Sequence, residues 1–476
     1  MPIPGQTITI NDPGLGLVEP AATSPLVLGC CASSTVDTLQ SFSSKNDAIS
    51  ALGEGPLTQA VCRILDIAGG PVRAMRLNGS VAATWGSVTD NAVGGGTGTV
   101  TLSGTPLDAY DLIVEILTSG SVANLDFTWR YSLDNGNTYS EPLTGAASYL
   151  MPNTGSTLTF VDGAGPDEFV ATMTHTASST APYYGTADLS SAVTALLADP
   201  TEWAFVVLTG TPASTSDGAT MFAALATHLT TFETNFRYVR AMMDAGDDTT
   251  TNALTDYVAA TDNRISVCYG TATIAVSRAF QGYGTAARSL VEVAGARAAG
   301  SLISTDLARV RSGALTGVTA VSHDERVTEV LDQARFTTAR TWLGRPGFYL
   351  TNARIKSAPG SDFRYWQHGR IMDVACSTVY LTQQEMISAA ARTNADGTIN
   401  ELDAIRYETR GTADLRAQLT QPVNAEGFQG HVSELSYSID RTNSLATTEE
   451  VRSEVSLRPL GYPKQITTTI GFALSV

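Results

Sequence analysis

The chain has 476 residues, a length that corresponds to roughly two to four domains of ordinary size. Hydrophobic residues make up 43% of it and charged residues only 16%, so the chain can bury a sizeable core and is not a disordered one. The net charge of −17, from 46 acids and 29 bases, argues against nucleic-acid binding, because phosphate contacts need a basic face.

The sequence shows no sign of a membrane or of secretion. No apolar run approaches the roughly 20 residues of a membrane span, and the start, MPIPGQTITINDPG, has neither the basic nor the apolar region of a secretory signal. The cysteines are odd in number and without CxxC spacing, which favours buried free thiols over a disulfide framework: Cys30, Cys31, Cys62, Cys268 and Cys376. We therefore expect synthesis in a reducing cytoplasm and no membrane partner.

The first predicted element is an N-terminal arm, residues 1–20. It holds four prolines and one strand-like piece, Thr7-Ile8-Thr9-Ile10, and has too little apolar surface to fold alone. An α/β unit follows over residues 21–80. Its predicted elements are a buried strand at 25–30, two helices between 47 and 68 that divide near Pro56, and a strand at 71–78.

The composition changes over residues 81–185. Short runs of β-branched and aromatic residues alternate with Gly, Asn and Asp, which predicts an all-β insertion domain. Asp134-Asn135-Gly136-Asn137 predicts a hairpin turn between two such runs, because Asn and Gly tolerate a positive φ. Ten acids and one base, Arg130, lie between residues 81 and 185. This charge favours a solvated module on the outside of the protein.

Alternating strands and helices return over residues 186–325, which together with 21–80 form the predicted central α/β domain. The apolar run Trp203–Leu208 is typical of a strand in a central parallel sheet. The other predicted elements are a helix capped by Asp188, helices at about 219–243, 251–261 and 286–300, and a strand at Arg264–Tyr269.

A C-terminal domain is predicted over residues 326–465, followed by a C-terminal strand arm at 466–476. The domain contains extended pieces around a turn at Gly344–Gly347, a helix within 364–392, and strands at 431–440 and 449–458. The final strand, 464–474, places its large apolar residues on one side: Ile466, Ile470, Phe472 and Leu474. Both ends of the chain are thus strand-like with little local support.

No sequence motif indicates catalysis. Walker-type, GxSxG and HExxH patterns are absent, and Gly282-Tyr283-Gly284 lacks the third glycine of a dinucleotide site. The five histidines are isolated, which favours ordinary core or surface roles over metal binding. The carboxylates Asp244, Asp247 and Asp248 lack EF-hand spacing, and we interpret them as a solvated helix end. We expect no enzyme, metal or cofactor.

Several segments resemble contractile tail sheath proteins. The strand PLVLG, the helix LGEGPLTQA and the strand PVRAMRLN follow one another as in the N-terminal part of that family. GRPGFYLTNARI, RIMDVACSTVYLTQQEM and the ending VSLRPLGYPKQITTTIGFALSV are similar to its later parts. The resemblance covers about 21–78 and 186–476, with gaps. The β insertion departs from a minimal sheath protein, and the family allows such insertions on its outer face.

The resemblance implies a late virion structural protein that is not an enzyme. Sheath subunits stack as hexameric rings into a helical polymer around an inner tube, and contraction drives the tube through a cell envelope. The implied partners are other copies of the chain, the inner tail tube protein, and baseplate and tail terminator proteins. The expected location is a virion tail, where the sheath serves viral genome ejection, or a contractile injection particle.

The resemblance also implies how subunits join, since arms in this family add strands to a neighbour's sheet. The implied inter-subunit residues are Thr7, Ile8, Thr9, Ile10, Ile466, Thr468, Ile470, Phe472 and Leu474. The alternative is that both termini pair within their own subunit.

Residues 326–370 carry eight bases against three acids, a net charge of +5 in an acidic chain. In the sheath family this part faces the tube. The possible tube-facing residues are Arg335, Arg340, Arg345, Arg354, Lys356, Arg364 and Arg370. The alternative is ordinary salt bridging within the fold. The rival function for the whole chain is a secreted or surface β-rich adhesion module, which the missing signal and the free cysteines disfavour.

Overall fold

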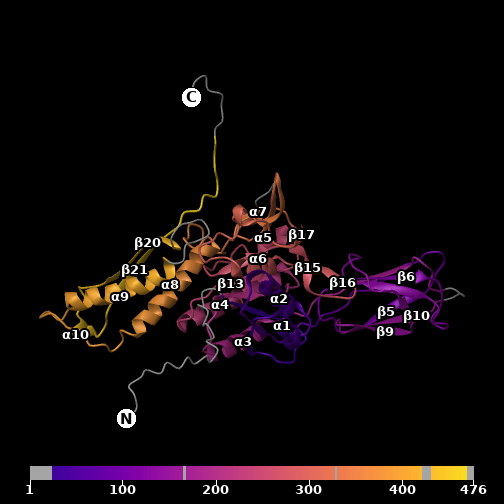
Figure 1. The fold of residues 1–476 in the computed structure, drawn as a ribbon, viewed down its shortest axis with the longest axis horizontal. Helices are drawn as coiled ribbons and strands as arrows, with labels where there is room; N and C mark the ends of the chain where they lie inside the picture. Colours follow the sequence, from indigo (N-terminus) through magenta and orange to yellow (C-terminus); the bar gives the residue numbers. More distant parts are fainter. Residues whose placement is uncertain (1–23, 164–167, 327–329, 421–429, 469–476) are drawn as a thin grey trace, which may run out of the picture.

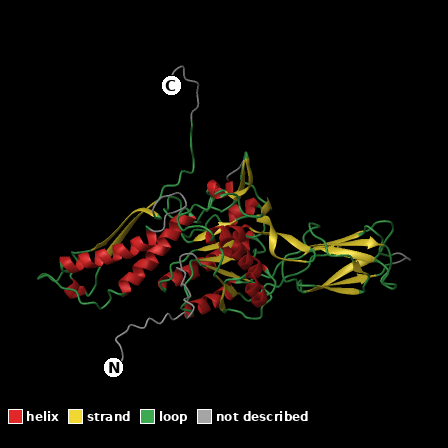
Figure 2. Ribbon diagram, viewed as in Figure 1, coloured by secondary structure: helices red, strands yellow, loops and turns green. Residues whose placement is uncertain are grey.

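The computed structural model describes residues 24–163, 168–326, 330–420 and 430–468. The molecule is elongated and has three parts along its long axis (Figures 1 and 2). Strands form one end, a mixed α/β body forms the middle, and two long helices with a small sheet form the other end.

A six-stranded sheet lies in the middle part, in the order β14-β13-β12-β1-β3-β2. Five strands run parallel, and β2 closes one edge antiparallel to β3. Every residue of β1 and β12 is buried, as expected for a parallel sheet covered on both faces. The strands predicted in this region are confirmed: β1 Pro25–Gly29, β3 Val72–Arg76, β12 Phe205–Leu208 and β14 Ile265–Cys268, to which the structure adds β2 Leu39–Phe42 and β13 Ala241–Asp244.

Helices cover both faces of this sheet. Successive strand residues point to opposite faces, so these apolar strands present side chains on both faces for helices to pack against. Leu26 and Leu28 pack with α3, α4 and α5, whereas Val27 packs with α1 and α2 on the other face. Phe205 and Val207 pack against α6 on that second face. The helices are α1 Lys45–Leu52, α2 Pro56–Ala68, α3 Thr186–Ala198, α4 Thr215–Thr234, α5 Thr250–Asp256 and α6 Leu290–Ala299.

The helix starts follow local capping signals. The Ser44 hydroxyl accepts a hydrogen bond from the first turn of α1, and α2 begins at Pro56 as predicted. Asp188 is not the N-cap of α3, which is Gly185. The Asp188 carboxylate instead reaches back from the third helical position and accepts the Gly185 N–H at 2.8 Å.

The prediction that α4 continues to about residue 243 was wrong. The helix ends at Thr234, and Phe236 takes a φ of 60°, a left-handed conformation that breaks the helix. The apolar residues that follow belong to the approach to β13 and to β13 itself. Asp244 is therefore the last residue of a strand and only 4% exposed, so its interpretation as a solvated helix end was also wrong.

The described residues between β3 and α3 form eight strands and no helix. They build a three-stranded sheet, β5-β10-β9, and a five-stranded sheet, β4-β11-β6-β7-β8. Both sheets contribute to one aromatic core around Trp129 and Phe160, whose ring centres lie 4.8 Å apart. The strands are β4 Thr89–Asn91, β5 Thr99–Gly104, β6 Asp111–Thr118, β7 Thr128–Ser132, β8 Leu143–Thr144, β9 Ser148–Met151, β10 Ser156–Val161 and β11 Thr174–Ser178.

The predicted tight hairpin at 134–137 is only partly present. Asn135 and Gly136 have φ angles of 55° and 83°, as the pattern predicted. However, β7 pairs with β8, so the whole of residues 133–142 lies between the two strands. The cause is Asp134, whose carboxylate accepts hydrogen bonds from Thr138 and from the backbone of Gly284. The Thr138 bonds hold the turn itself, and the Gly284 bond ties it to a distant hairpin.

That distant hairpin, which the sequence analysis missed, connects the middle part to the β end. It consists of β15 Thr271–Phe280 and β16 Tyr283–Ser289, with β17 Val318–Val321 beside β15. Val276 and Tyr283 are buried in the aromatic core of the β end. The helix predicted at 286–300 begins only at Leu290, because the preceding residues complete β16.

The C-terminal part contains the predicted extended pieces and helix, now seen as β18 Ala339–Trp342, β19 Arg345–Leu350 and α8 Trp366–Gln384. A second long helix, α9 Glu401–Leu419, packs against α8 and was not predicted. Strands β20 Val432–Ile439 and β21 Ser453–Pro459 lie on α9, where a Cβ on Gly411 would come within 2.9 Å of the Tyr437 ring. Short helical turns complete this half: η1 Val310–Ser312, α7 Val330–Gln333 and α10 Leu445–Thr448.

Candidate interaction surfaces

Catalytic features are few in the described part of the chain. It holds no group of three or more His, Cys, Asp or Glu side chains that could bind a metal ion, and none of its helices is long and apolar enough to cross a bilayer. All five cysteines are free. Burial raises the pKa of Cys30 to about 12 and that of Cys31, Cys62 and Cys376 to about 11. These thiols are therefore protonated at neutral pH and poor nucleophiles.

An acidic crevice of about 440 Å³ lies at the carboxyl ends of β13 and β14. Asp247 and Asp248 line it, and Asp244 lies at its buried base. Burial raises the pKa of Asp244 to about 7, while the Ser289 hydroxyl and the Gly246 N–H donate to its carboxylate. The carboxylate is thus held by the protein's own donors and has a structural role.

The predicted strand arms lie largely beyond the described residues. Thr7, Ile8, Thr9 and Ile10 fall outside them, as do Ile470, Phe472 and Leu474. The described remainder, Ile466 to Thr468, is exposed and not in a strand, and Ile466 is 82% exposed. The segment leaves the body of the protein after β21 (Figure 1). The structure therefore shows the root of the C-terminal arm and leaves its strand pairing untested.

Two side chains fix the root of this arm to the body. The Tyr462 hydroxyl donates to the backbone oxygen of Ser304. The Lys464 Nζ forms an ion pair with Asp306 and donates to Asn352 Oδ1 at 2.9 Å. Residues beyond 464 can therefore extend from a defined point on the surface.

The small sheet β20–β21 presents a candidate docking edge. It has two strands, and in the described residues no third strand pairs with either one. One face packs on α9, with Tyr437 and Ile439 buried, whereas β21 is largely exposed along its length. An exposed edge of this kind carries backbone groups that can pair with an added strand.

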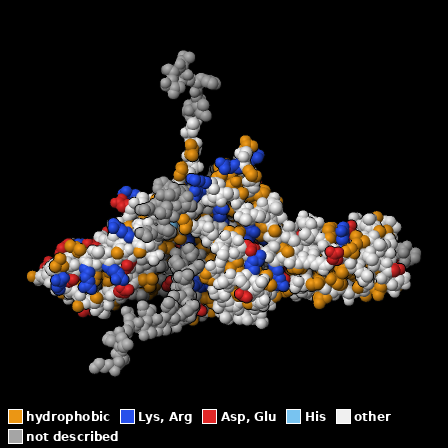
Figure 3. Space-filling model, in the orientation of Figure 1, with side chains coloured by type: hydrophobic (Ala, Val, Ile, Leu, Met, Phe, Trp, Pro, Cys, Tyr) orange, Lys and Arg blue, Asp and Glu red, His pale blue; other side chains and the backbone are white. Residues whose placement is uncertain are grey.

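Most of the seven predicted tube-facing bases have partners within the fold. Arg354 forms an ion pair with Asp332 at 2.8 Å, and Arg335 donates to the backbone oxygen of Ser357. Arg340 is half-buried, with its guanidinium carbon 4.0 Å from the centre of the Trp342 ring. The two exposed members of the set are Arg345 and Arg364. Figure 3 shows Lys and Arg side chains over the middle and the helical end, and few over the β end.

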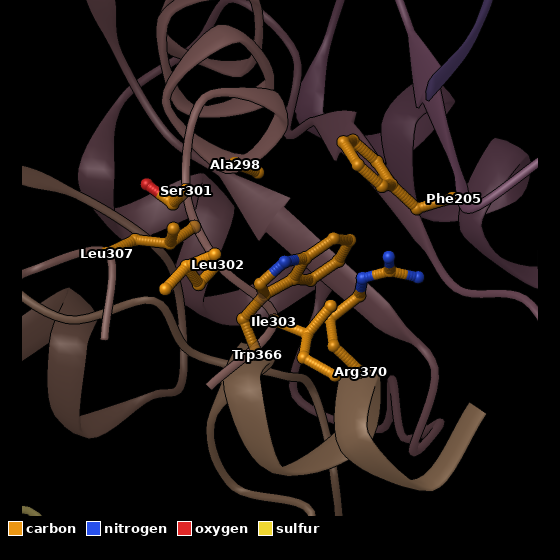
Figure 4. A pocket seen from close by; sticks show the side chains of 8 residues that line it. All are labelled: Phe205, Ala298, Ser301, Leu302, Ile303, Leu307, Trp366 and Arg370. Atoms are coloured by element: carbon orange, nitrogen blue, oxygen red, sulfur yellow. The ribbon is translucent and has the colours of Figure 1, made fainter. Parts of the chain in front are cut away.

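Arg370 does not belong to a surface, which corrects its assignment as a tube-facing residue. It is 4% exposed and lies where α8 docks on the central sheet, with its guanidinium over the ring of Phe205 (Figure 4). Trp366 packs edge-on against the same ring at 5.5 Å. The cavity left between these side chains is about 10 Å³, barely the volume of one water molecule. This closely packed joint holds α8 against the central sheet.

Lys356 is likewise a buried residue, so its assignment to the tube-facing set was wrong. It is 1% exposed, and its ammonium donates to the Ala334 oxygen at 2.8 Å and lies 3.7 Å from the centre of the Phe336 ring. Burial, with a smaller contribution from the charge of Arg335, lowers the pKa of Lys356 to about 7. The fold therefore carries the cost of a buried cation at neutral and acid pH.

Replacing Lys356 with Met is expected to raise stability by roughly 1–3 kcal/mol at pH 6, because the buried charge disappears. Between pH 7 and 10.5 the unfolded state binds a proton on Lys356 that the folded state has lost, so the native protein gains stability as the pH rises. The advantage of Lys356→Met should therefore shrink across this window. Urea unfolding at pH 6 and pH 10 measures it, with Lys45→Met, a half-exposed lysine, as the control. An equal difference at both pH values would contradict the account.

A buried ion pair joins the β end to the middle part. Arg288 of β16 donates to both carboxylate oxygens of Asp108, at 2.7 and 2.6 Å, and to the hydroxyl of Tyr283. The side chains of Arg288 and Asp108 are 5% and 2% exposed. The two residues are 180 positions apart in the chain, and no local sequence signal indicates the pair.

The chain is similar to one protein family in sequence and to several solved structures in fold. The family model "DUF2586, N-terminal domain" matches residues 3–354, whereas no curated protein sequence matches the chain. Two chains from the baseplate of the anti-feeding prophage are similar in structure over 100% of both chains. The one from the contracted state has a TM-score of 0.54 at 14% identity, and the one from the six-fold symmetrised baseplate has 0.54 at 11%.

A chain from the helical sheath of the same prophage in its contracted state has a TM-score of 0.52 at 12% identity, over 99% of both chains. These structures are similar to the whole length of this chain and so share its fold. Since the family model spans well over half of the sequence, the chain belongs to the DUF2586 family and has the fold of contractile tail sheath proteins.

Proposed function

We propose that this protein is the structural subunit of a contractile sheath, which polymerises as stacked hexameric rings around an inner tube and contracts to drive the tube through a cell envelope. The observation that carries the proposal is the full-length similarity to a chain of a contracted helical sheath. The alternative of an adhesion module has no comparable support, because that similarity includes the middle and helical parts as well as the β end.

The joints between subunits are proposed to form by strand addition. A four-residue strand at Thr7–Ile10 and a longer one at Ile466–Leu474 would pair with the edges of the β20–β21 sheet of neighbouring copies. Each net backbone hydrogen bond contributes about 1 kcal/mol, so each added strand contributes several. The exposed Ile466 and the fixed root at Lys464 support an arm that reaches outward from a rigid body.

The β end is proposed to lie on the outer surface of the sheath, and the helical end nearer the tube. The β end carries ten acids and one base and lies at the opposite end of the long axis from the β20–β21 sheet. The remaining candidates for contact with an acidic tube surface are the exposed Arg345 and Arg364 and the half-buried Arg340. Contacts with baseplate and tail terminator proteins would occur at the ends of the polymer.

Deleting the β end tests this arrangement. The Thr180 N–H donates to the Thr84 backbone oxygen, and the Thr84 N–H donates to the Thr180 hydroxyl. These bonds join the two connections to the middle part, so residues 85–179 can be replaced by a short Gly/Ser link. Phe280 and Tyr283 would need polar substitutions, because they pack into the removed core, and Arg288 would need Met. We expect tubes of normal axial repeat and smaller outer diameter in electron micrographs. A folded deletion variant that does not polymerise would contradict the outer placement.

The function itself is tested by mixing the purified full-length protein with the inner-tube protein of the same particle and sedimenting the mixture. Co-sedimenting particles with sheathed tubes in negative-stain micrographs are the expected result. Sedimentation of the two proteins as separate small species at all concentrations would contradict the proposal.

A further inference from the structure

A groove of about 530 Å³ lies between the middle part and the helical end. Its floor comes from the residues that precede β12 and β13, including the buried Trp203 and Val239. Helix α8 supplies the opposite wall with Val374, Thr378 and Leu381. The groove is therefore bounded by two parts of the fold that are distant in sequence.

Two large apolar side chains on the two walls remain exposed. Phe236 and Leu381 are each 53% exposed, and the Phe236 ring stacks on Tyr380 of α8 with 4.5 Å between ring centres. Exposed apolar surface that lines a concave site is typical of a place where another segment binds.

Ser24 is the first described residue, and it is bonded to a residue that lines this groove. Its backbone oxygen accepts from the N–H of Ala204, a groove residue, at 2.7 Å, and its hydroxyl donates to the Pro71 oxygen at 2.9 Å. Ser24 is 2% exposed and leads directly into β1. The chain before it therefore enters the molecule at the amino edge of the parallel sheet, where the groove is.

We infer that residues 15–23 bind in this groove of their own subunit. Their sequence, LGLVEPAAT, is apolar apart from Glu19 and Thr23, and Pro20 favours an extended conformation. Nine extended residues span up to about 30 Å, enough to cross the groove from Ser24 to α8 and α9. Leu15, Leu17 and Val18 would cover the exposed faces of Phe236 and Leu381.

This segment is distinct from the proposed inter-subunit strand at Thr7–Ile10, which precedes it. Bound in the groove, residues 15–23 contact the central sheet and α8 at once and so join the two parts of the subunit. A force applied to the arm would then act on both parts. This contact lies within one chain and does not depend on polymerisation.

Photo-crosslinking in the full-length protein tests the inference. Benzoylphenylalanine at Leu17 is activated in an equal mixture of ¹⁵N-labelled and unlabelled protein, kept dilute, and the linked peptides are identified by mass spectrometry. We expect links to peptides that contain Trp203, Phe236 or Leu381, with both peptides carrying the same label. The probe at Thr7 serves as a control and should give no link to these peptides in the dilute protein.

A matched pair of substitutions completes the design. Leu381→Asp should lower the yield of these links several-fold, whereas Ile387→Asp, 72% exposed and outside the groove, should not. Both positions are exposed, so both variants should keep the thermal unfolding of the parent. Links between differently labelled peptides would assign the groove to a neighbouring copy, and links elsewhere or none at all would mean that residues 15–23 do not bind there. Each of these outcomes would overturn the inference.

Discussion

Removing residues 1–12, or residues 466–476, is expected to abolish polymerisation while leaving a soluble, cooperatively folded monomer. The described core is built from residues 26–439 and contains neither segment, so its packing should survive either truncation. The C-terminal truncation also keeps Tyr462 and Lys464, which hold the root of the arm. Loss of one added strand removes several kcal/mol from each joint between subunits.

Sedimentation velocity and thermal melting of each truncated chain measure the two effects separately. A chain in which residues 1–12 are replaced by a Gly/Ser segment of equal length is the control, since it keeps the length and removes the strand-forming side chains. It should behave like the truncation. An unfolded truncation would mean that the arms complete their own subunit's core, and a truncation that still polymerises would place the contacts elsewhere.

Replacing Arg288 with Met is expected to cost about 3–5 kcal/mol of stability, because it leaves the Asp108 carboxylate buried without its partner. Replacing both residues, Asp108→Leu with Arg288→Met, should recover much of this loss, since no unpaired charge remains. The matched control is Arg130→Met, which breaks the more exposed pair with Glu115 and should cost less than about 1 kcal/mol.

Urea unfolding of the four proteins measures these differences. We expect Arg288→Met to lower the free energy of unfolding much more than Arg130→Met does. The double variant should regain much of the stability that Arg288→Met loses. Equal small losses for the two single variants would show that the buried pair does not hold the β end to the middle part.

The sequence predicted the elements whose signals are local. The uninterrupted apolar run at Phe205–Leu208 indicated a buried parallel strand, and Pro56 marked the start of α2. Asn135 and Gly136 took the positive φ angles that their residue types allow. Each of these signals depends on a few neighbouring residues, which is why each could be interpreted without a fold.

The features that depend on distant partners were not predictable in this way. Strand β16 is rich in small and polar residues, and it is a strand because β15 pairs with it and Tyr283 enters the aromatic core. Lys356 and Arg370 counted as surface charge in the sequence, yet the fold buries both. Net charge over a segment does not show which side chains point inward, so Lys356 and Arg370 no longer belong to the proposed tube-facing set.

The most direct test of the sheath proposal is a cryo-electron microscopy reconstruction of the polymer formed by the full-length protein. The account predicts six subunits per ring, with the β end on the outside and the β20–β21 sheet of each subunit extended by strands 7–10 and 466–474 from neighbouring copies. Particles without six-fold rings, or a β20–β21 sheet that remains two-stranded in the polymer, would contradict it.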